Sequence, residues 1–217
     1  SVYYESISPP PKNIKIDQDD NWLAIYEIEA NQEIDIKATG QVKTGINLPR
    51  ATKNLEVYLQ PKKFWPVTAP QIQVISSKVT TPRSIYDYVV STLDYDYNRI
   101  NNPQRLGAIE ALSNPKNSLC TEFTDLFITL ARAKGIPARE IQGFAYSSDQ
   151  KIKPLNLNND ILHAWPEYYD SKQKSWKAID PTWAKTTNGI DYFNSLDLNH
   201  ITFVTHGLDS ELPLPAG

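Results

Sequence analysis

The sequence predicts an α+β fold in which helices precede an antiparallel β-sheet, with a small β-rich region ahead of them. Two observations carry this prediction. Apolar residues partly alternate in the first third of the chain, whereas from Thr81 to residue 134 they recur every three or four positions. Alternation returns after residue 138. We place a boundary near residue 78, so that residues 1–78 form the β-rich region and residues 79–217 the main domain.

The β-rich region contains three segments typical of half-buried strands. Residues 22–29 and 33–38 carry apolar side chains at partly alternating positions, and residues 54–60 have a similar pattern. Residues 61–70 place two aromatic residues between prolines. We expect this stretch to be a connector that lies on the main domain rather than a free linker.

The main domain begins with an amphipathic helix. Thr81 has a side chain that can cap a helix, and Pro82 suits the first turn. A second, short helix is expected at residues 104–112, ahead of a run of turn-forming residues. The apolar face of the first helix consists of Ile85, Tyr88, Val89 and Leu93.

A third helix is expected to begin close to Cys120, the only cysteine of the chain. Gly135 and Pro137 supply the stop that such a helix needs. Its apolar residues share one side of a helix with 3.6 residues per turn. They are Cys120, Phe123, Leu126, Phe127, Leu130 and Ala131.

Strands follow this third helix. Residues 138–146 and 163–169 are expected to be strands, with a polar loop at residues 147–159 between them. A further strand at residues 175–179 is joined to the preceding one by a short turn, and one more is expected at residues 201–205. The helices therefore come before a β-sheet.

Composition excludes several classes of function. The 22 basic and 25 acidic residues are interleaved, so no basic stripe is present to bind nucleic acid. No uninterrupted apolar run approaches the roughly 20 residues that a membrane-spanning helix needs. The chain begins with Ser1 and contains no methionine. From this we expect a processed protein that has lost a signal peptide or an N-terminal anchor, and therefore a secreted or cell-envelope location.

The residue types that bind metals and cofactors are scarce. A single cysteine excludes an intrachain disulfide, and three histidines supply few ligands for a structural zinc site. The sequence has no glycine-rich phosphate-binding loop and no paired-cysteine motif. We therefore expect no metal ion, no nucleotide and no other cofactor.

Cys120, His163 and Asp180 together meet the requirements of nucleophilic catalysis. A thiol attacks as its thiolate, which the N-terminus of a helix favours through its aligned peptide dipoles. Taken singly, each is more often a structural residue: a small core cysteine, a hydrogen-bonded histidine or a turn aspartate. Together they supply a nucleophile, a general base and an orienting carboxylate. Because a short turn joins their strands, we expect His163 and Asp180 to be cross-strand neighbours.

Four motifs resemble the core of the transglutaminase-like superfamily, which has a papain-like fold. They are Leu-Cys-Thr-Glu-Phe at residues 119–123, Ala-Lys-Gly-Ile-Pro-Ala-Arg at 133–139, His-Ala-Trp at 163–165 and Asp-Pro-Thr-Trp at 180–183. The order of cysteine, histidine and aspartate also agrees, and the resemblance is to compact bacterial members. It implies a catalytic domain at residues 79–217, with a helix-borne cysteine packed on an antiparallel sheet.

The resemblance also implies a reaction. Cys120 would attack a carboxamide or peptide carbonyl of a protein or peptide substrate and form a thioester, with His163 as the general base and Asp180 as its orienting partner. Water would then give hydrolysis, as in a peptidase or amidase, whereas an amine would give a cross-link. The sequence leaves both outcomes open. The alternative is a catalytically silent protein-interaction module on the same fold.

Further residues are candidates for supporting roles. The backbone N–H of Cys120 is one expected oxyanion donor. Gln104 and Tyr97 are candidates for the second donor because they lie on the segment that borders the cysteine in this superfamily, although such residues are more often surface or packing residues. Trp165 and Trp183 flank the triad motifs, and either line a substrate groove or pack against the catalytic pair.

Overall fold

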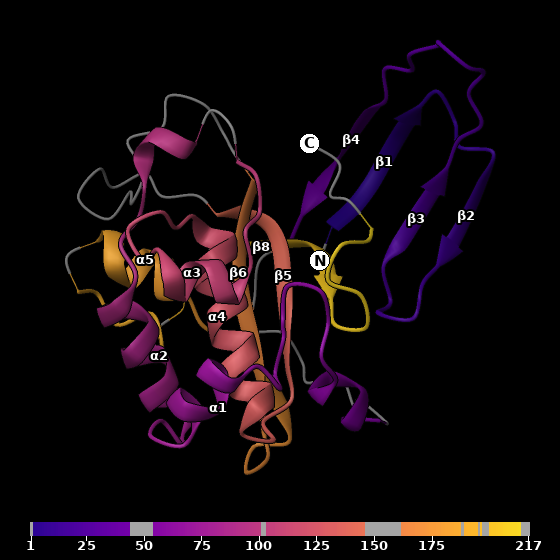
Figure 1. Cartoon of the computed structure of the whole chain (residues 1–217). Helices are drawn as coiled ribbons and strands as arrows, with labels where there is room; N and C mark the ends of the chain where they lie inside the picture. The colour runs from indigo at the N-terminus through magenta and orange to yellow at the C-terminus, as the bar shows by residue number, and fades with distance from the viewer. Residues whose placement is uncertain are drawn as a thin grey trace.

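The computed structural model describes residues 2–43, 54–100, 103–145, 162–187, 189–194, 196 and 200–213. Four N-terminal strands stand beside a larger body of helices and one antiparallel sheet (Figure 1). This confirms the predicted α+β class, while the boundary near residue 78 stays a prediction. The expected loop at residues 147–159 lies outside the described residues. Within the described part of the chain, no helix is long and apolar enough to cross a membrane.

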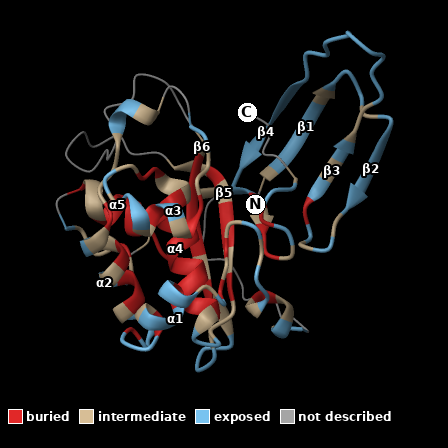
Figure 2. Ribbon diagram, in the orientation of Figure 1, coloured by how far each residue is buried: buried red, intermediate tan, exposed pale blue. Residues whose placement is uncertain are grey.

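The N-terminal region consists of two small antiparallel sheets. In one, β1 (Val2–Ser8) pairs with β4 (Lys37–Val42), and in the other β2 (Asn13–Ile16) pairs with β3 (Trp22–Ile25). Figure 2 shows that these strands are mostly exposed, in contrast to the buried centre of the main body. Two strands alone bury little apolar surface, so these sheets depend on their surroundings for stability.

Three expectations for this region were wrong in extent or type. The strand expected at residues 22–29 stops at residue 25, which pairs with the first residue of β2. The strand expected at 33–38 begins only at residue 37, which pairs with the last residue of β1. Residues 54–60 contain a 3₁₀ helix, η1 (Glu56–Leu59), instead of a strand. The side chain of Asn54 accepts the backbone N–H of Glu56 and so starts a turn.

The connector at residues 61–70 leads into a helix that the sequence did not predict. This helix, α1 (Pro70–Ser76), has a proline in its first turn and is only seven residues long, too short for a clear helical period. Trp65 and Ile72 are fully buried in the core of the main body. The connector therefore lies on the main body, as expected.

The first two predicted helices are present. In α2 (Pro82–Thr92), the hydroxyl of Thr81 accepts the backbone N–H of Ser84 at 3.1 Å, and the hydroxyl of Ser84 accepts the N–H of Thr81 at 3.0 Å. The second helix, α3 (Ala108–Ser113), begins later than expected because Gly107 has a φ of 86°, which no helical residue adopts.

The third predicted helix, α4 (Cys120–Ala133), is the centre of the main body. It contacts α1, α2 and α3 as well as the sheet, and the apolar side chains from Phe123 to Ala131 are fully buried. The helix ends in a Schellman motif, in which Ile136 donates to the carbonyl of Ala131 and Gly135, with a φ of 74°, donates to that of Arg132.

The sheet has the strand order β7-β6-β5-β8, and all neighbours are antiparallel. The strands are β5 (Ala138–Ala145), β6 (Leu162–Asp170), β7 (Ser175–Ala178) and β8 (His200–His206). They confirm the four strands expected here to within one or two residues. An additional short helix, α5 (Pro181–Thr186), directly follows β7.

Hydrogen bonds connect the N-terminal region to the C-terminal end of β8 and the residues just after it. A carboxylate oxygen of Asp19 accepts the backbone N–H groups of Gly207 and Leu208 at 2.9 and 2.8 Å. The side chain of Asn21 donates to the carbonyl of Thr205 and accepts its N–H, both at 2.8 Å. These bonds lie at the C-terminal end of β8, and His200 is the first residue at its N-terminal end.

Candidate active site

Cys120 is the first residue of α4 and is half-buried. The segment in front of it is held by backbone hydrogen bonds from Asp94 to Pro115 and from Asp96 to Ser118, each 2.9 Å long. The first N–H groups of a helix have no partner within the helix, and the aligned peptide dipoles add a partial positive charge there. The fold therefore places Cys120 at the positive end of the α4 dipole.

A buried carboxylate fixes the first turn of α4. Glu122 accepts the backbone N–H of Leu119 at 2.8 Å and that of Leu106 at 2.7 Å, and it pairs with Arg99 at 3.1 Å. Its side chain is fully buried. The carboxylate thus ties the residue that precedes Cys120 to the chain segment ahead of α3. Its position two residues after the cysteine made it visible in the motif, but the sequence did not indicate its role.

His163 lies on β6 and Asp180 caps the start of α5. The imidazole Nε2 is 2.8 Å from Oδ2 of Asp180, and both side chains are buried. The two residues are not cross-strand neighbours in the strict sense, because the last ladder pair of β6 and β7 is Glu167 with Ala178. Asp180 lies two residues beyond that pair and reaches the imidazole as the N-cap of α5.

The second ring nitrogen of His163 is available to the cysteine. Nε2 is committed to Asp180, and the imidazole also forms a hydrogen bond with the side chain of Cys120. Nδ1 is the nitrogen left for that bond. An ionised carboxylate can only accept, so Nε2 carries a proton toward Asp180. The arrangement brings together the three residues that the sequence singled out, in the order thiol, imidazole, carboxylate.

The charges in this group stabilise one another. Burial alone would lower the pKa of His163, but the carboxylate of Asp180 and the bond to Cys120 raise it to about 10. Burial alone would raise the pKa of Asp180, but His163 and, after it, His200 lower it to about 2. The imidazole is therefore protonated and the carboxylate ionised at neutral pH.

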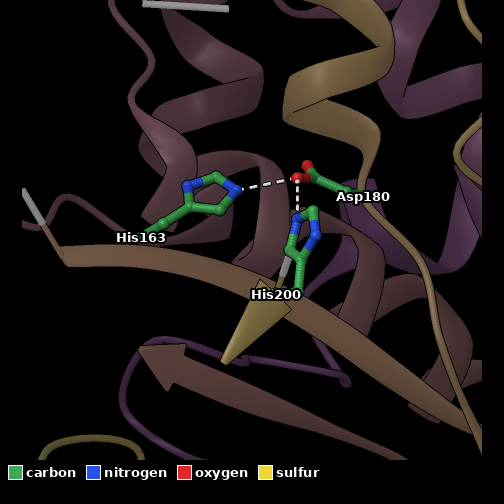
Figure 3. A group of neighbouring side chains, drawn as sticks. All are labelled: His163, Asp180 and His200. Carbon is green, nitrogen blue, oxygen red and sulfur yellow. Dashed lines mark hydrogen bonds and ion pairs between the residues drawn. The ribbon is translucent and has the colours of Figure 1, made fainter. Parts of the chain in front are cut away.

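His200 joins this group, although no motif in the sequence pointed to it. Its Nε2 is 3.0 Å from the same oxygen, Oδ2 of Asp180, that accepts from His163. Figure 3 shows both imidazoles converging on Asp180, while the second nitrogen of His163 points away from the carboxylate. The chain has only three histidines, and this scarcity is the signal in the sequence that could have drawn attention to His200.

Two tryptophans pack against the imidazoles. Trp165 and Trp183 are 1% and 3% exposed, and their ring centroids are 5.7 and 5.9 Å from that of His163. Both also contact His200 edge-on, at 5.0 and 4.7 Å. Their burial favours the packing role over that of a groove wall. In this position they exclude water from the bond between His163 and Asp180, which strengthens it.

The two candidates for the second oxyanion donor are exposed. Tyr97 is 52% exposed, and Gln104 is exposed as well. Near the start of α4 lies Tyr95, which pairs with Ser118 in an isolated bridge and whose ring is 5.1 Å from that of Tyr97. Burial, followed by the negative charge of Cys120, raises the pKa of Tyr95. The sequence reasoning missed Tyr95, and the roles of Tyr97 and Gln104 stay predictions.

His163, Asp180 and His200 also have the residue types of a metal site. One ligand atom from each lies within 4.8 Å of the others. Both imidazole–carboxylate distances, however, are those of hydrogen bonds, and the protons on the two nitrogens already satisfy the carboxylate. An ion would have to displace both protons, so the geometry fits a hydrogen-bonded group better than a set of metal ligands.

Comparisons with known proteins identify relatives of this chain. The family model of the transglutaminase-like superfamily matches residues 66–181, more than half of the 217 residues. Over 89 residues the chain is 27% identical to a protein-glutamine gamma-glutamyltransferase of Pseudomonas aeruginosa. That match covers 39% of this chain but only 13% of the relative, so this chain corresponds to a small part of it.

A solved structure with low sequence identity shares the fold. A candidate cysteine protease from Cytophaga hutchinsonii superposes with a TM-score of 0.56 at 17% identity, which covers 89% of this chain and 70% of that chain. The periplasmic domain of TgpA from Pseudomonas aeruginosa gives a TM-score of 0.41 at 19% identity, covering 61% and 49% of the two chains. The secreted or cell-envelope location expected from the sequence stays a prediction.

Proposed function

The chain belongs to the transglutaminase-like superfamily, and on that premise we propose that it is an enzyme that uses Cys120 to attack amide groups of proteins or peptides. The observation that carries the proposal is the position of the His163 imidazole. Its Nε2 bonds Asp180 at 2.8 Å, and its other ring nitrogen, Nδ1, is left for the hydrogen bond with Cys120. Such an arrangement provides a nucleophile, a proton carrier and an orienting carboxylate in one line.

In this proposal the nucleophile is the thiolate of Cys120, because a thiol attacks as its thiolate, and its counter-ion is the imidazolium of His163. Because the pKa of His163 is raised to about 10, the ring holds a proton on each nitrogen at neutral pH. The proton on Nε2 is held by Asp180, and the proton on Nδ1 faces the sulfur of Cys120. The second of these is the one that moves during the reaction, since Asp180 keeps its charge throughout.

The reaction forms and then resolves a thioester. The Cys120 sulfur bonds to the carbonyl carbon, and the electron pair of the carbonyl moves to its oxygen. When this intermediate collapses, the carbon–nitrogen bond breaks and the leaving amine takes the proton from His163. Water or a second amine, giving up a proton to His163, then attacks the thioester and releases the sulfur. Water yields a carboxylate and an amine yields a new amide.

Charge on the carbonyl oxygen needs hydrogen-bond donors. The backbone N–H of Cys120, at the start of α4, is the first donor in this proposal. Tyr97 and Gln104 remain our candidates for the second, on the segment that leads from α2 to α3. Trp165 and Trp183 are assigned the shielding of His163, consistent with their burial.

The test follows acylation of Cys120 directly. The protein is mixed with a glutamine-containing peptide and a fluorescent primary amine, and ammonia release, amine incorporation and intact protein mass are followed together. Because Cys120 is the only cysteine, an adduct that neutral hydroxylamine removes is assigned to a thioester at Cys120, whereas an amide adduct on a lysine of equal mass resists it. We expect an adduct and turnover in the wild type and neither in Cys120→Ala, and the ratio of acid to amide product then separates hydrolysis from transamidation.

The thiol itself provides a test that needs no substrate. We expect iodoacetamide to alkylate Cys120 at pH 6 at least about 100-fold faster than a free thiol, because the proposed nucleophile is a thiolate with the protonated imidazole of His163 beside it. In His163→Ala this excess should disappear. Equal, slow alkylation of wild type and His163→Ala would show a structural cysteine and contradict the proposal.

A further inference from the structure

His200 shares with His163 the carboxylate oxygen on which the proposed mechanism depends. We infer that His200 is a positioning residue, whose hydrogen bond to Asp180 holds the carboxylate in the orientation that aims His163 at Cys120. This inference rests on the proposed function. Beyond Cys120, His163 and Asp180, a fourth residue on β8 thereby has a defined role in the same site.

The carboxylate of Asp180 is held at three points. Oδ1 accepts the backbone N–H of Trp183 at 2.9 Å, and Oδ2 accepts from His163 at 2.8 Å and from His200 at 3.0 Å. The bond to Trp183 alone leaves the plane of the carboxylate free to tilt. A second bond to Oδ2, from a direction different from that of His163, removes this freedom (Figure 3).

The position of His200 is itself set by the sheet. It is the first residue of β8 and pairs with Ala145 of β5. The β5–β8 ladder contains a bulge at Gln142 and Gly143, which shifts the register of β8 by one residue before the ladder reaches His200. A β-carbon at Gly143 would lie 1.9 Å from the carbonyl oxygen of Ile201, so only glycine permits this approach.

Burial and ring packing keep the His200 imidazole in one orientation. Its side chain is 2% exposed, and its ring contacts Trp165 and Trp183 edge-on. The centroid of the His163 ring is 5.9 Å away. Because the carboxylate can only accept, Nε2 of His200 carries a proton toward it, as Nε2 of His163 does. A single oxygen thus receives two N–H groups on buried, sterically fixed rings.

The inference predicts that the donor matters more than the ring. His200→Phe keeps an aromatic ring against the two tryptophans but removes the N–H, whereas His200→Gln loses the ring but presents an amide N–H at a similar reach. We expect His200→Phe to lower the alkylation rate of Cys120 at pH 6 by about 10- to 100-fold, the range for loss of a hydrogen bond to a charged group. His200→Gln should stay within about threefold of the wild type. In turnover assays the loss should appear in kcat rather than KM, since His200 is assigned no contact with substrate.

A second buried histidine provides a matched control. His206 lies at the other end of β8 and bonds the buried carboxylate of Glu140 at 3.1 Å, away from Cys120. His206→Phe removes the same kind of bond and should destabilise the protein without changing the alkylation rate. Urea unfolding of all variants establishes that each is folded under the assay conditions.

The outcomes separate the inference from the proposed function. If the wild-type thiol reacts no faster than a free thiol, the proposed function fails. If the wild type is fast and His200→Phe is equally fast, or if His200→Gln is as slow as His200→Phe, only the role of His200 is overturned. A slow His200→Phe with a fast His200→Gln and a fast His206→Phe supports the inference.

Discussion

The backbone N–H of Leu119 donates to the buried carboxylate of Glu122 at 2.8 Å, and this bond fixes the residue immediately before Cys120. Leu106 donates to the other oxygen of the same carboxylate at 2.7 Å. One side chain therefore joins the first turn of α4 to the chain ahead of α3. The position of the candidate nucleophile depends on this acceptor as well as on the helix.

Replacing Glu122 by glutamine tests this dependence. The amide has one acceptor oxygen in place of two, so either Leu119 or Leu106 is left with an unsatisfied N–H, and Arg99 loses its anion. We expect the free energy of unfolding to fall by about 3 kcal/mol, measured by urea denaturation. Glu110→Gln, in the exposed first turn of α3, is the control and should change it by less than about 0.5 kcal/mol. Similar losses in both variants would contradict the assignment.

The pair of His163 and Asp180 should give stability a defined pH dependence. The pKa of Asp180 is lowered to about 2 from an ordinary 3.8, so its carboxylate stabilises the fold above pH 3.8 and this contribution disappears as the pH falls toward 2. The pKa of His163 is raised to about 10 from 6.5, so its contribution is complete below pH 6.5 and disappears as the pH rises through 10.

Asp180→Asn measures that contribution. The difference in unfolding free energy between wild type and variant should be largest between about pH 4 and pH 6.5, and should shrink by about 2 kcal/mol as the pH falls to 2. It should shrink again toward pH 10. Urea denaturation followed by tryptophan fluorescence gives the curve. A difference that is constant with pH would mean that the two residues do not interact as charges.

Gly143 and Gly135 form a pair that separates steric contact from backbone conformation. Gly143→Ala should cost about 3 kcal/mol and slow the alkylation of Cys120, because the new methyl group would push β8 and His200 away from β5. A methyl group at Gly135 would meet open space, so Gly135→Ala should lower the free energy of unfolding only by the cost of a φ of 74°, about 1 kcal/mol. It should leave the alkylation rate unchanged. Thermal unfolding and the alkylation assay check both expectations.

Arg105 and Arg83 each face two carboxylates, one pair buried and one exposed. Arg105 lies between the fully buried Asp125 and Glu140, whereas Arg83 pairs with Asp87 and Asp191 at the surface. Arg105→Met should lower the unfolding free energy by about 3–5 kcal/mol, since it leaves two buried carboxylates without their cation. Arg83→Met should cost less than about 1 kcal/mol.

The Arg105 variant also carries an internal check. Lowering the pH should recover part of its stability relative to the wild type, because the two carboxylates can then be protonated. Denaturation curves at pH 5 and pH 7 provide the comparison. A loss that is the same at both pH values would instead indicate a packing defect.

The sequence anticipated the parts of the site that are local. The helix from Cys120 follows from a 3.6-residue period and a glycine stop, and the strands that carry His163 and precede Asp180 follow from alternation around a short turn. The sequence places Asp180 at the end of a strand, although an aspartate followed by a proline is also a frequent start of a helix. Its contact with His163 was expected from strand pairing, whereas Asp180 lies beyond the β6–β7 ladder and reaches His163 as the N-cap of α5.

The remainder depends on contacts between distant segments. His200 bonds a carboxylate 20 positions earlier, and its place is set by a register shift in β8 opposite Gly143 of β5. A glycine within a strand is a weak signal, because it marks a bulge in one protein and a bend in another. Strand ends in the N-terminal region are likewise set by the lengths of their partners, which no local pattern contains.

The contact between Asn21 and Thr205 has a consequence for association between molecules. β8 is an edge strand of the described sheet, and edge strands offer free N–H and C=O groups to strands of other molecules. At Thr205 both groups are occupied by the amide of Asn21, in the manner of one rung of a further strand. The N-terminal region thus closes this stretch of the edge, so removing it would expose a template for intermolecular β-pairing and favour aggregation.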